Sequence, residues 1–171
     1  EDLYYMPNQF NNPANWQAHY ETTAPEINRD TKGEVDVFVA GMGTTGTLMG
    51  CSKYFREHNP RTKVVGIEPS LDHRIQGLKN MQEAIVPEIY DPSLLDKIEP
   101  CSDDDAFNTA RDMALMEGLF CGISSGAALW GAILTARQMP RGSTVVVLLA
   151  DRGDRYLSTE VFRSVCAICP P

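Results

Sequence analysis

The chain has 171 residues, 43% of them hydrophobic and 22% charged, which is enough for one globular domain with a real core but few for a two-domain enzyme. Its 23 acidic and 15 basic side chains give a net charge of −8, which repels phosphate backbones and anionic lipid. The sequence contains no run of 18 apolar residues, the length needed to span a membrane. Nucleic acid and membrane are therefore not expected partners.

The N-terminal third alternates helical and strand patterns. Helical spacing appears over residues 14–20 and again after Pro25, a residue that suits the first turn of a helix. An apolar run over 35–40 predicts a strand, residues 47–58 predict a helix, and residues 63–68 predict a second strand that Pro69 ends.

The rest of the chain continues this alternation. Residues 70–100 predict mixed loop and short helix, and Ser102 and Asp105 form a capping box that opens a helix of about 14 residues. A small-residue helix then runs to Gln138, and residues 144–150 form a continuous apolar strand of the kind buried on both faces of a parallel sheet. The pattern predicts an α/β fold with a largely parallel sheet.

Residues 41–46 read G-M-G-T-T-G between the first strand and its helix, and Glu68 ends the next strand. This is the spacing of a dinucleotide site, so a nicotinamide enzyme is one alternative. The free amides and positive end of the helix favour an anion, and three hydroxyls suit the oxygens of a terminal phosphate monoester better than an internal pyrophosphate: Thr44, Thr45 and Thr47. The other alternative is a tight turn in which Thr only caps the helix.

A second small-residue turn, over residues 122–128, also joins an apolar segment to a helix. Its hydroxyls either cap that helix or point at a ligand. Taken with the first turn, it adds a second candidate contact for a bound molecule.

Five motifs in order resemble the fold-type II pyridoxal-phosphate enzymes of the cysteine synthase family, nearest to its B-type branch. They lie at residues 8–15, 41–47, 73–78, 122–127 and 151–159 and so cover nearly the whole chain. The resemblance implies a three-layer α/β domain that binds pyridoxal 5′-phosphate, with Glu68 a strand-end residue that has no ribose to bind.

The resemblance also implies roles for individual residues. The loop would hold the cofactor phosphate through its amides and hydroxyls, with the residues Gly43, Thr44, Thr45, Gly46 and Thr47. Thr45 stands where many members of the family have Gly. This difference restricts which branch of the family the chain resembles, but it does not determine the substrate. Gly77 would lie close to the cofactor, where a side chain would clash.

Three further positions complete the implied site. Ser124 would face the pyridine nitrogen, where a neutral hydroxyl favours β-elimination and replacement over transamination. Gln9 would bind the substrate carboxylate. Asp151, at the carboxyl end of the last strand, would lie where ligands bind in such sheets, or else would cap the turn that follows it.

The family's catalytic Schiff-base lysine has no counterpart here, so no catalytic residue is expected in this chain. The sequence contexts of five lysines suggest solvated surface charge: Lys32, Lys53, Lys63, Lys79 and Lys97. The first residue is not Met, and we expect the chain to be a C-terminal part: residues 1–12 cross over from a missing N-terminal domain, and 13–171 form the cofactor-binding domain.

The resemblance implies that the intact protein makes cysteine from O-acetylserine or O-phosphoserine and sulfide or a thiol donor, as a cytoplasmic homodimer, and that the chain alone is inactive. The alternatives are a serine or threonine dehydratase, a cystathionine β-synthase-like enzyme, or a non-catalytic stand-alone domain. An odd number of cysteines, five, suits reduced thiols. Cys166 and Cys169 have metal-site spacing but no second pair, so no metal is expected.

Overall fold

A computed structural model describes residues 3–162 of the chain. Its sheet has four parallel strands in the order β3-β2-β1-β4. The strands are β1 (Val37–Gly41), β2 (Lys63–Pro69), β3 (Lys97–Cys101) and β4 (Val145–Val147). The predicted α/β fold with a parallel sheet is confirmed.

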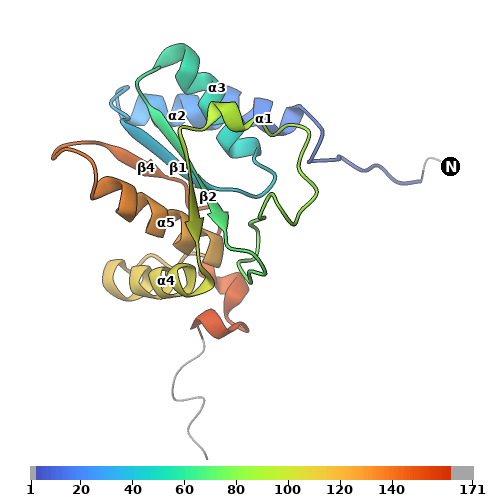
Figure 1. Cartoon of the computed structure of the whole chain (residues 1–171), viewed down its shortest axis with the longest axis vertical. Coiled ribbons are helices and arrows are strands. Elements are labelled where there is room, and N and C mark those ends of the chain that lie inside the picture. The colour runs from blue at the N-terminus through green and yellow to red at the C-terminus, as the bar shows by residue number, and fades with distance from the viewer. Residues whose placement is uncertain (1–2, 163–171) are drawn as a thin grey trace, which may run out of the picture.

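Helices cover both faces of this sheet and make three layers, with α1, α2 and α3 on one side and α4 and α5 on the other (Figure 1). The helices are α1 (Ala14–Ala18), a π-helical turn (His19–Thr23), α2 (Ala24–Asp30), α3 (Gly46–His58), α4 (Asp103–Glu117) and α5 (Ile123–Ala136). Short 3-10 helices lie at Pro92–Leu94, Gly153–Tyr156 and Glu160–Phe162.

Strand β1 lies at the centre of the core, and alternate side chains serve opposite faces. Phe38 and Ala40 belong to the apolar cluster beneath α3, whereas Val37 and Val39 belong to the cluster on the α5 side. All four side chains are buried, which is the pattern of a parallel strand covered on both faces.

Two strand predictions need correction. The predicted strand over 144–150 is shorter, and Val145–Val147 are half-buried because, within residues 3–162, β4 is an edge strand that pairs with β1 alone. Strand β3 was missed in a stretch predicted as loop and short helix, since it contains Pro100. Because β3 is the opposite edge strand, a proline without an N–H is tolerated there.

The predicted cap of α4 is confirmed. The Ser102 hydroxyl accepts from the backbone amide of Asp105 at 3.2 Å and donates to the Asp105 carboxylate at 2.5 Å. Within residues 3–162, no helix combines the length and apolarity that a bilayer crossing requires.

The strand order creates a switch point. From β1 the chain adds β2 and β3 on one side and then returns to place β4 on the other side of β1. The connections that leave the carboxyl ends of β1 and β4 therefore diverge, and ligands of open parallel sheets bind in the crevice at such a point.

Candidate functional site

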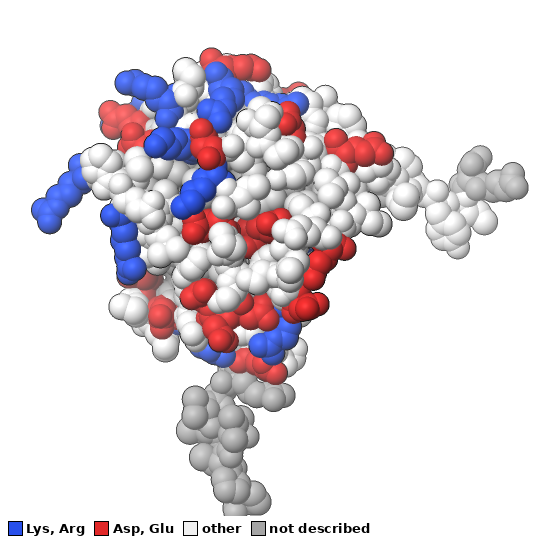
Figure 2. Space-filling model, viewed as in Figure 1, with Lys and Arg blue, Asp and Glu red and all other residues white. Residues whose placement is uncertain are grey.

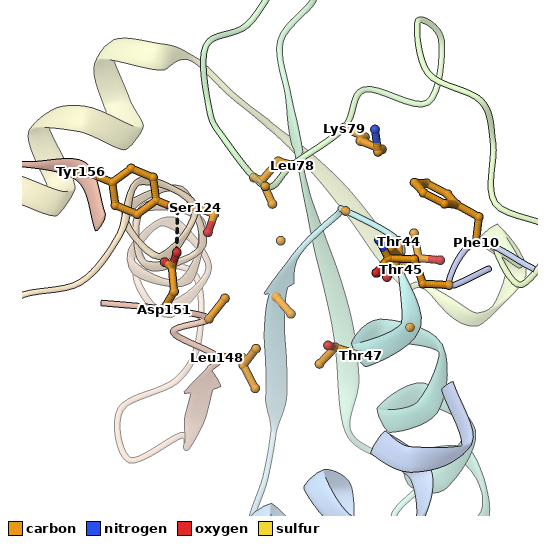
Figure 3. Close-up of a pocket in the computed structure, with 17 residues that line it drawn as sticks. Phe10, Thr44, Thr45, Thr47, Leu78, Lys79, Ser124, Leu148, Asp151 and Tyr156 are labelled. Carbon is orange, nitrogen blue, oxygen red and sulfur yellow. Dashed lines mark hydrogen bonds between the residues drawn. The ribbon is translucent and has the colours of Figure 1, made fainter. Parts of the chain in front are cut away.

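A cavity of about 510 Å³ lies at this switch point. Its lining comes from the carboxyl ends of β1 and β4, the first turns of α3 and α5, and the segments 9–10 and 77–79 (Figure 3). It contains every residue that the sequence assigned to the site: Gln9, Gly43, Thr44, Thr45, Gly46, Thr47, Gly77, Ser124 and Asp151. Segments more than 140 residues apart in the chain, from Gln9 to Asp151, thus meet in one place.

The loop over residues 43–47, which we call the Gly-Thr loop, packs too closely for side chains at its two glycines. A Cβ on Gly43 would lie 2.6 Å from the backbone oxygen of Gly77, and one on Gly46 would lie 1.9 Å from Asn15 Oδ1. Gly77 itself has a φ of +90°, which few other residues adopt. Glycine at positions 43 and 46 therefore allows the loop to pack directly against Gly77 and Asn15.

Thr45 adopts a left-handed conformation, with φ +67°, which is unusual for a β-branched residue. It occupies the cap position of α3, yet its side chain makes no capping hydrogen bond. Its hydroxyl is buried and has no partner within the described structure. A strained backbone and an unpartnered hydroxyl beside the first-turn amides of α3 argue against simple helix capping and point to a ligand.

The hydroxyls of Thr44 and Thr47 are hydrogen-bonded by side chains of the helical segment that contains α1. Thr44 Oγ1 accepts a hydrogen bond from Asn15 Nδ2 at 3.1 Å, and Thr47 Oγ1 lies 3.2 Å from His19 Nε2. The Nδ1 atom of His19 lies 3.0 Å from Thr23 Oγ1, and burial lowers the pKa of His19 below its ordinary value. Neither Asn15 nor His19 was predicted from the sequence to support the site, although their i, i+4 spacing on a predicted helix places them on one face.

The opposite end of the cavity carries Ser124, Asp151 and Tyr156 (Figure 3). Ser124 is 7% exposed in the first turn of α5, and a Cβ on Gly77 would lie 3.7 Å from its hydroxyl. Tyr156 donates to Asp151 Oδ2 at 2.6 Å, while Asp151 Oδ1 is buried without a partner. Burial, followed by the bond to Asp151, raises the pKa of Tyr156 to about 12, so the phenol keeps its proton.

Asp151 does not cap the turn that follows it. The residue at the cap position of the 3-10 helix Gly153–Tyr156 is Arg152, and the Asp151 carboxylate is bonded to Tyr156 instead. The capping alternative for Asp151 was therefore wrong.

Lys79 was predicted to be a solvated surface charge, and the structure places it at the wall of the cavity. It is half-buried, lines the cavity, and its Nζ lies 5.3 Å from the centre of the Phe10 ring. Its backbone amide donates to the Met42 carbonyl at 2.7 Å, which ties the 77–79 segment to the end of β1. The cavity therefore has a basic side chain among its lining residues.

Glu68, the acidic residue that a dinucleotide site would need, is engaged elsewhere. Its carboxylate accepts from the backbone amide of Met81 at 2.8 Å, and it is not among the cavity residues. Glu68 is therefore not placed to bind the ribose of a nicotinamide cofactor, which argues against that alternative. In the part of the chain that the structure describes, no group of three or more His, Cys, Asp or Glu could hold a metal ion, and Cys166 and Cys169 lie outside that part.

Residues 1–151 match the family model described as "Pyridoxal-phosphate dependent enzyme". The chain belongs to this family. Among curated relatives it is 47% identical over 154 residues to cysteine synthase B of Salmonella typhimurium, an alignment that covers 90% of this chain and 50% of that protein. The chain thus spans about half the length of the curated relatives it matches.

Solved structures of family members have the same fold. An O-acetylserine sulfhydrylase, isoform 3, of Entamoeba histolytica matches with a TM-score of 0.87 and 37% identity over 95% of this chain and 50% of its own. An O-ureido-L-serine synthase matches with a TM-score of 0.86 and 41% identity over 92% of this chain and 52% of its own. The predicted resemblance to cysteine synthases is confirmed.

The cavity fits the family's cofactor, pyridoxal phosphate. The unpartnered Thr45 hydroxyl and the first-turn amides of α3 are donors that a phosphate, which only accepts, would satisfy. The backbones at Gly43 and Gly46 leave no room for side chains that would block those donors. The opposite end offers the Ser124 hydroxyl and the Asp151 carboxylate.

Proposed function

We propose that this chain is the C-terminal, cofactor-binding part of a pyridoxal-phosphate-dependent cysteine synthase. The whole protein would replace the β-substituent of O-acetylserine or O-phosphoserine with sulfide or a related thiol donor. The observation that carries the proposal is the buried, unpartnered Thr45 hydroxyl at the head of α3, inside a cavity at the switch point of the sheet. The similarity to cysteine synthases supports the choice of reaction.

In this proposal the Gly-Thr loop binds the cofactor phosphate. Its amides and the hydroxyls of Thr44, Thr45 and Thr47 donate to the phosphate oxygens, and the positive end of α3 adds a favourable field. Pyridoxal phosphate, when bound, supplies the electron sink for β-elimination and replacement. The neutral Ser124 hydroxyl faces the ring nitrogen and does not hold it protonated, which disfavours transamination.

The substrate end of the cavity is assigned to Gln9 and Lys79. Gln9 offers an uncharged amide to the amino acid carboxylate, and Lys79 places a cation on the cavity lining. A cation there suits an acceptor-rich leaving group such as phosphate better than a neutral acetyl ester. We therefore expect the Lys79 side chain to influence the choice between O-phosphoserine and O-acetylserine.

The remaining parts of the proposal concern the whole protein. The Schiff-base lysine would be supplied by a segment outside this chain, and residues 1–12 would be the crossover between the two domains. We also propose a cytoplasmic homodimer. The chain by itself would bind the cofactor weakly and make no cysteine, because a cofactor held mainly at its phosphate is not oriented for reaction.

Cysteine formation by the full-length protein tests this function. We expect cysteine from sulfide with O-acetylserine or O-phosphoserine, and a borohydride-reduced cofactor adduct on a lysine outside this chain. Release of pyruvate from serine or 2-oxobutanoate from threonine, without cysteine, would instead indicate a dehydratase. Cofactor binding without turnover of any of these substrates would support a non-catalytic domain.

Lys79→Gln tests the donor assignment, with Lys63→Gln on the exposed start of β2 as the matched control. We expect the Lys79 variant to lose at least about tenfold in kcat/KM for O-phosphoserine relative to O-acetylserine, equivalent to about 1.4 kcal/mol. The control should leave that ratio unchanged. Equal losses for both donors would remove Lys79 from donor selection.

A further inference from the structure

Asn15, at the second position of α1, joins two parts of the site. Its Nδ2 atom donates to the backbone oxygen of Gln9 at 2.7 Å and to Thr44 Oγ1 at 3.1 Å. Its Oδ1 atom lies 1.9 Å from the point that a Cβ on Gly46 would occupy. One amide group therefore contacts both the segment that contains Gln9 and the Gly-Thr loop. It fits there because residue 46 is glycine, with no Cβ to occupy the same space.

The hydrogen-bonding chemistry fixes the direction of these contacts. The Gln9 carbonyl only accepts, so the group that faces it must be the NH2 end of the Asn15 amide. The second hydrogen of that NH2 group then points to Thr44 Oγ1, whose oxygen acts as the acceptor. The Thr44 hydroxyl hydrogen is left to point elsewhere, and Thr44 lines the cavity.

A phosphate ester oxygen accepts hydrogen bonds and does not donate when it is ionised. A threonine that already accepts from an amide is oriented to donate to such an oxygen, and successive hydrogen bonds in one direction strengthen each other. Asn15 Nδ2 donates both to the Gln9 carbonyl and to Thr44 Oγ1, and only the second bond continues in the same direction, from the Thr44 hydroxyl to a phosphate oxygen.

We propose that Asn15 is a positioning residue that sets the Thr44 hydroxyl as a donor to the cofactor phosphate and couples phosphate binding to the order of the Gln9 segment. The inference rests on the proposed function, because it takes the ligand at the Gly-Thr loop to be the cofactor phosphate. Coupling of this kind is reciprocal: a bound phosphate stabilises the Gln9 segment, and an ordered Gln9 segment strengthens phosphate binding.

The contrast with Asn12 supplies a control. Asn12 lies three residues earlier and its Nδ2 also holds a backbone carbonyl of the N-terminal segment, that of Pro7, at 3.0 Å. Its Oδ1 accepts from the backbone amide of Ala14 at 3.0 Å, so it stabilises the start of α1. Neither of these side-chain bonds reaches the Gly-Thr loop, so its removal disturbs the same segment without the proposed coupling.

The first experiment measures the affinity of the full-length protein for pyridoxal phosphate and for inorganic phosphate. We expect Asn15→Ala to weaken both by about tenfold, and Asn12→Ala by less than about threefold. In a Thr44→Val background the Asn15 substitution should have little further effect, since it acts through the Thr44 hydroxyl. This double-mutant cycle compares the effect of the Asn15 substitution on affinity with and without Thr44→Val. If Asn15→Ala does not fold, Asn15→Ser is used in its place.

The second experiment follows hydrogen exchange of the amides at residues 8–12 with and without inorganic phosphate. In the wild-type protein phosphate should slow this exchange, and in Asn15→Ala it should not. If the wild-type protein binds neither probe, the proposed function fails. If it binds both, and Asn15→Ala matches it in affinity and in the phosphate-dependent exchange, the role of Asn15 is refuted.

Discussion

Replacing Thr45 with Gly should raise stability and lower ligand affinity at the same time. Thr45 is held at φ +67°, a conformation that costs a non-glycine residue about 1–2 kcal/mol. Its buried hydroxyl has no partner, at a further cost of about 1–3 kcal/mol. Glycine removes both costs. It also destabilises the folded state by about 0.5–1 kcal/mol through chain entropy and by a similar amount through the lost burial of the methyl group.

The net expectation for Thr45→Gly without ligand is a gain of about 2 kcal/mol, or roughly 4–8 °C in Tm for a protein of this size. With ligand the sign reverses. Loss of one charge-assisted hydrogen bond, about 1.5–3 kcal/mol, should weaken pyridoxal phosphate binding by about 10- to 150-fold.

Thermal unfolding with and without pyridoxal phosphate, together with a cofactor titration, measures both effects. Thr45→Ser is the control, because it keeps the hydroxyl and should bind within about threefold of the wild type. If Thr45→Gly binds the cofactor as tightly as the wild type, or is less stable than the wild type without it, the strain at Thr45 is not linked to ligand binding.

Three other changes test separate contacts. Gly43→Ala should cost about 1–3 kcal/mol in the free energy of unfolding and weaken cofactor binding, because its Cβ would meet the Gly77 carbonyl at 2.6 Å; an unchanged denaturation midpoint would contradict this packing. Tyr156→Phe should destabilise the protein by about 1–3 kcal/mol in urea unfolding, since it removes the phenol donor from Asp151 Oδ2 while Oδ1 already has no partner. The folded state lowers the pKa of His19, so the unfolded chain binds more protons and the stability that neutral His19 contributes is lost as pH falls below about 6.5; between pH 7 and 5, His19→Gln should lose less stability than the wild type, and parallel curves would refute the assignment.

The sequence predicted the fold where periodicity and composition agreed. The apolar run before Gly41 and the capping box at Ser102 both encode local structure that tertiary contacts reinforce, and both predictions hold. β3 escaped detection because Pro100 is a strong signal against a strand, and its position at the sheet edge is a property of the whole sheet. The exposure of β4 was missed for the same reason, since strand order cannot be read from a single apolar run.

The same distinction, between local sequence signals and tertiary contacts, applies to the residues of the candidate site. Thr44 and Ser124 were placed at loop-to-helix turns by local sequence features, and both line the cavity. Lys79 could not be placed, since its loop has no periodicity and its position depends on the contact between its amide and Met42. Asn15 was missed because its role depends on a contact across 29 residues of sequence.

The pairing of β4 with β1 has a consequence for synthesis on the ribosome. β1 and β2 are near in sequence, so the Gly-Thr loop and the first turn of α3 can form soon after they emerge. The pairing of Val37 with Val145 closes a loop of more than 100 residues, and the end of the cavity that carries Asp151 follows it. In the proposed function, a nascent chain would therefore present the phosphate-binding end of α3 before the opposite wall of the cavity exists, so the cofactor could dock before the enclosure around it is complete.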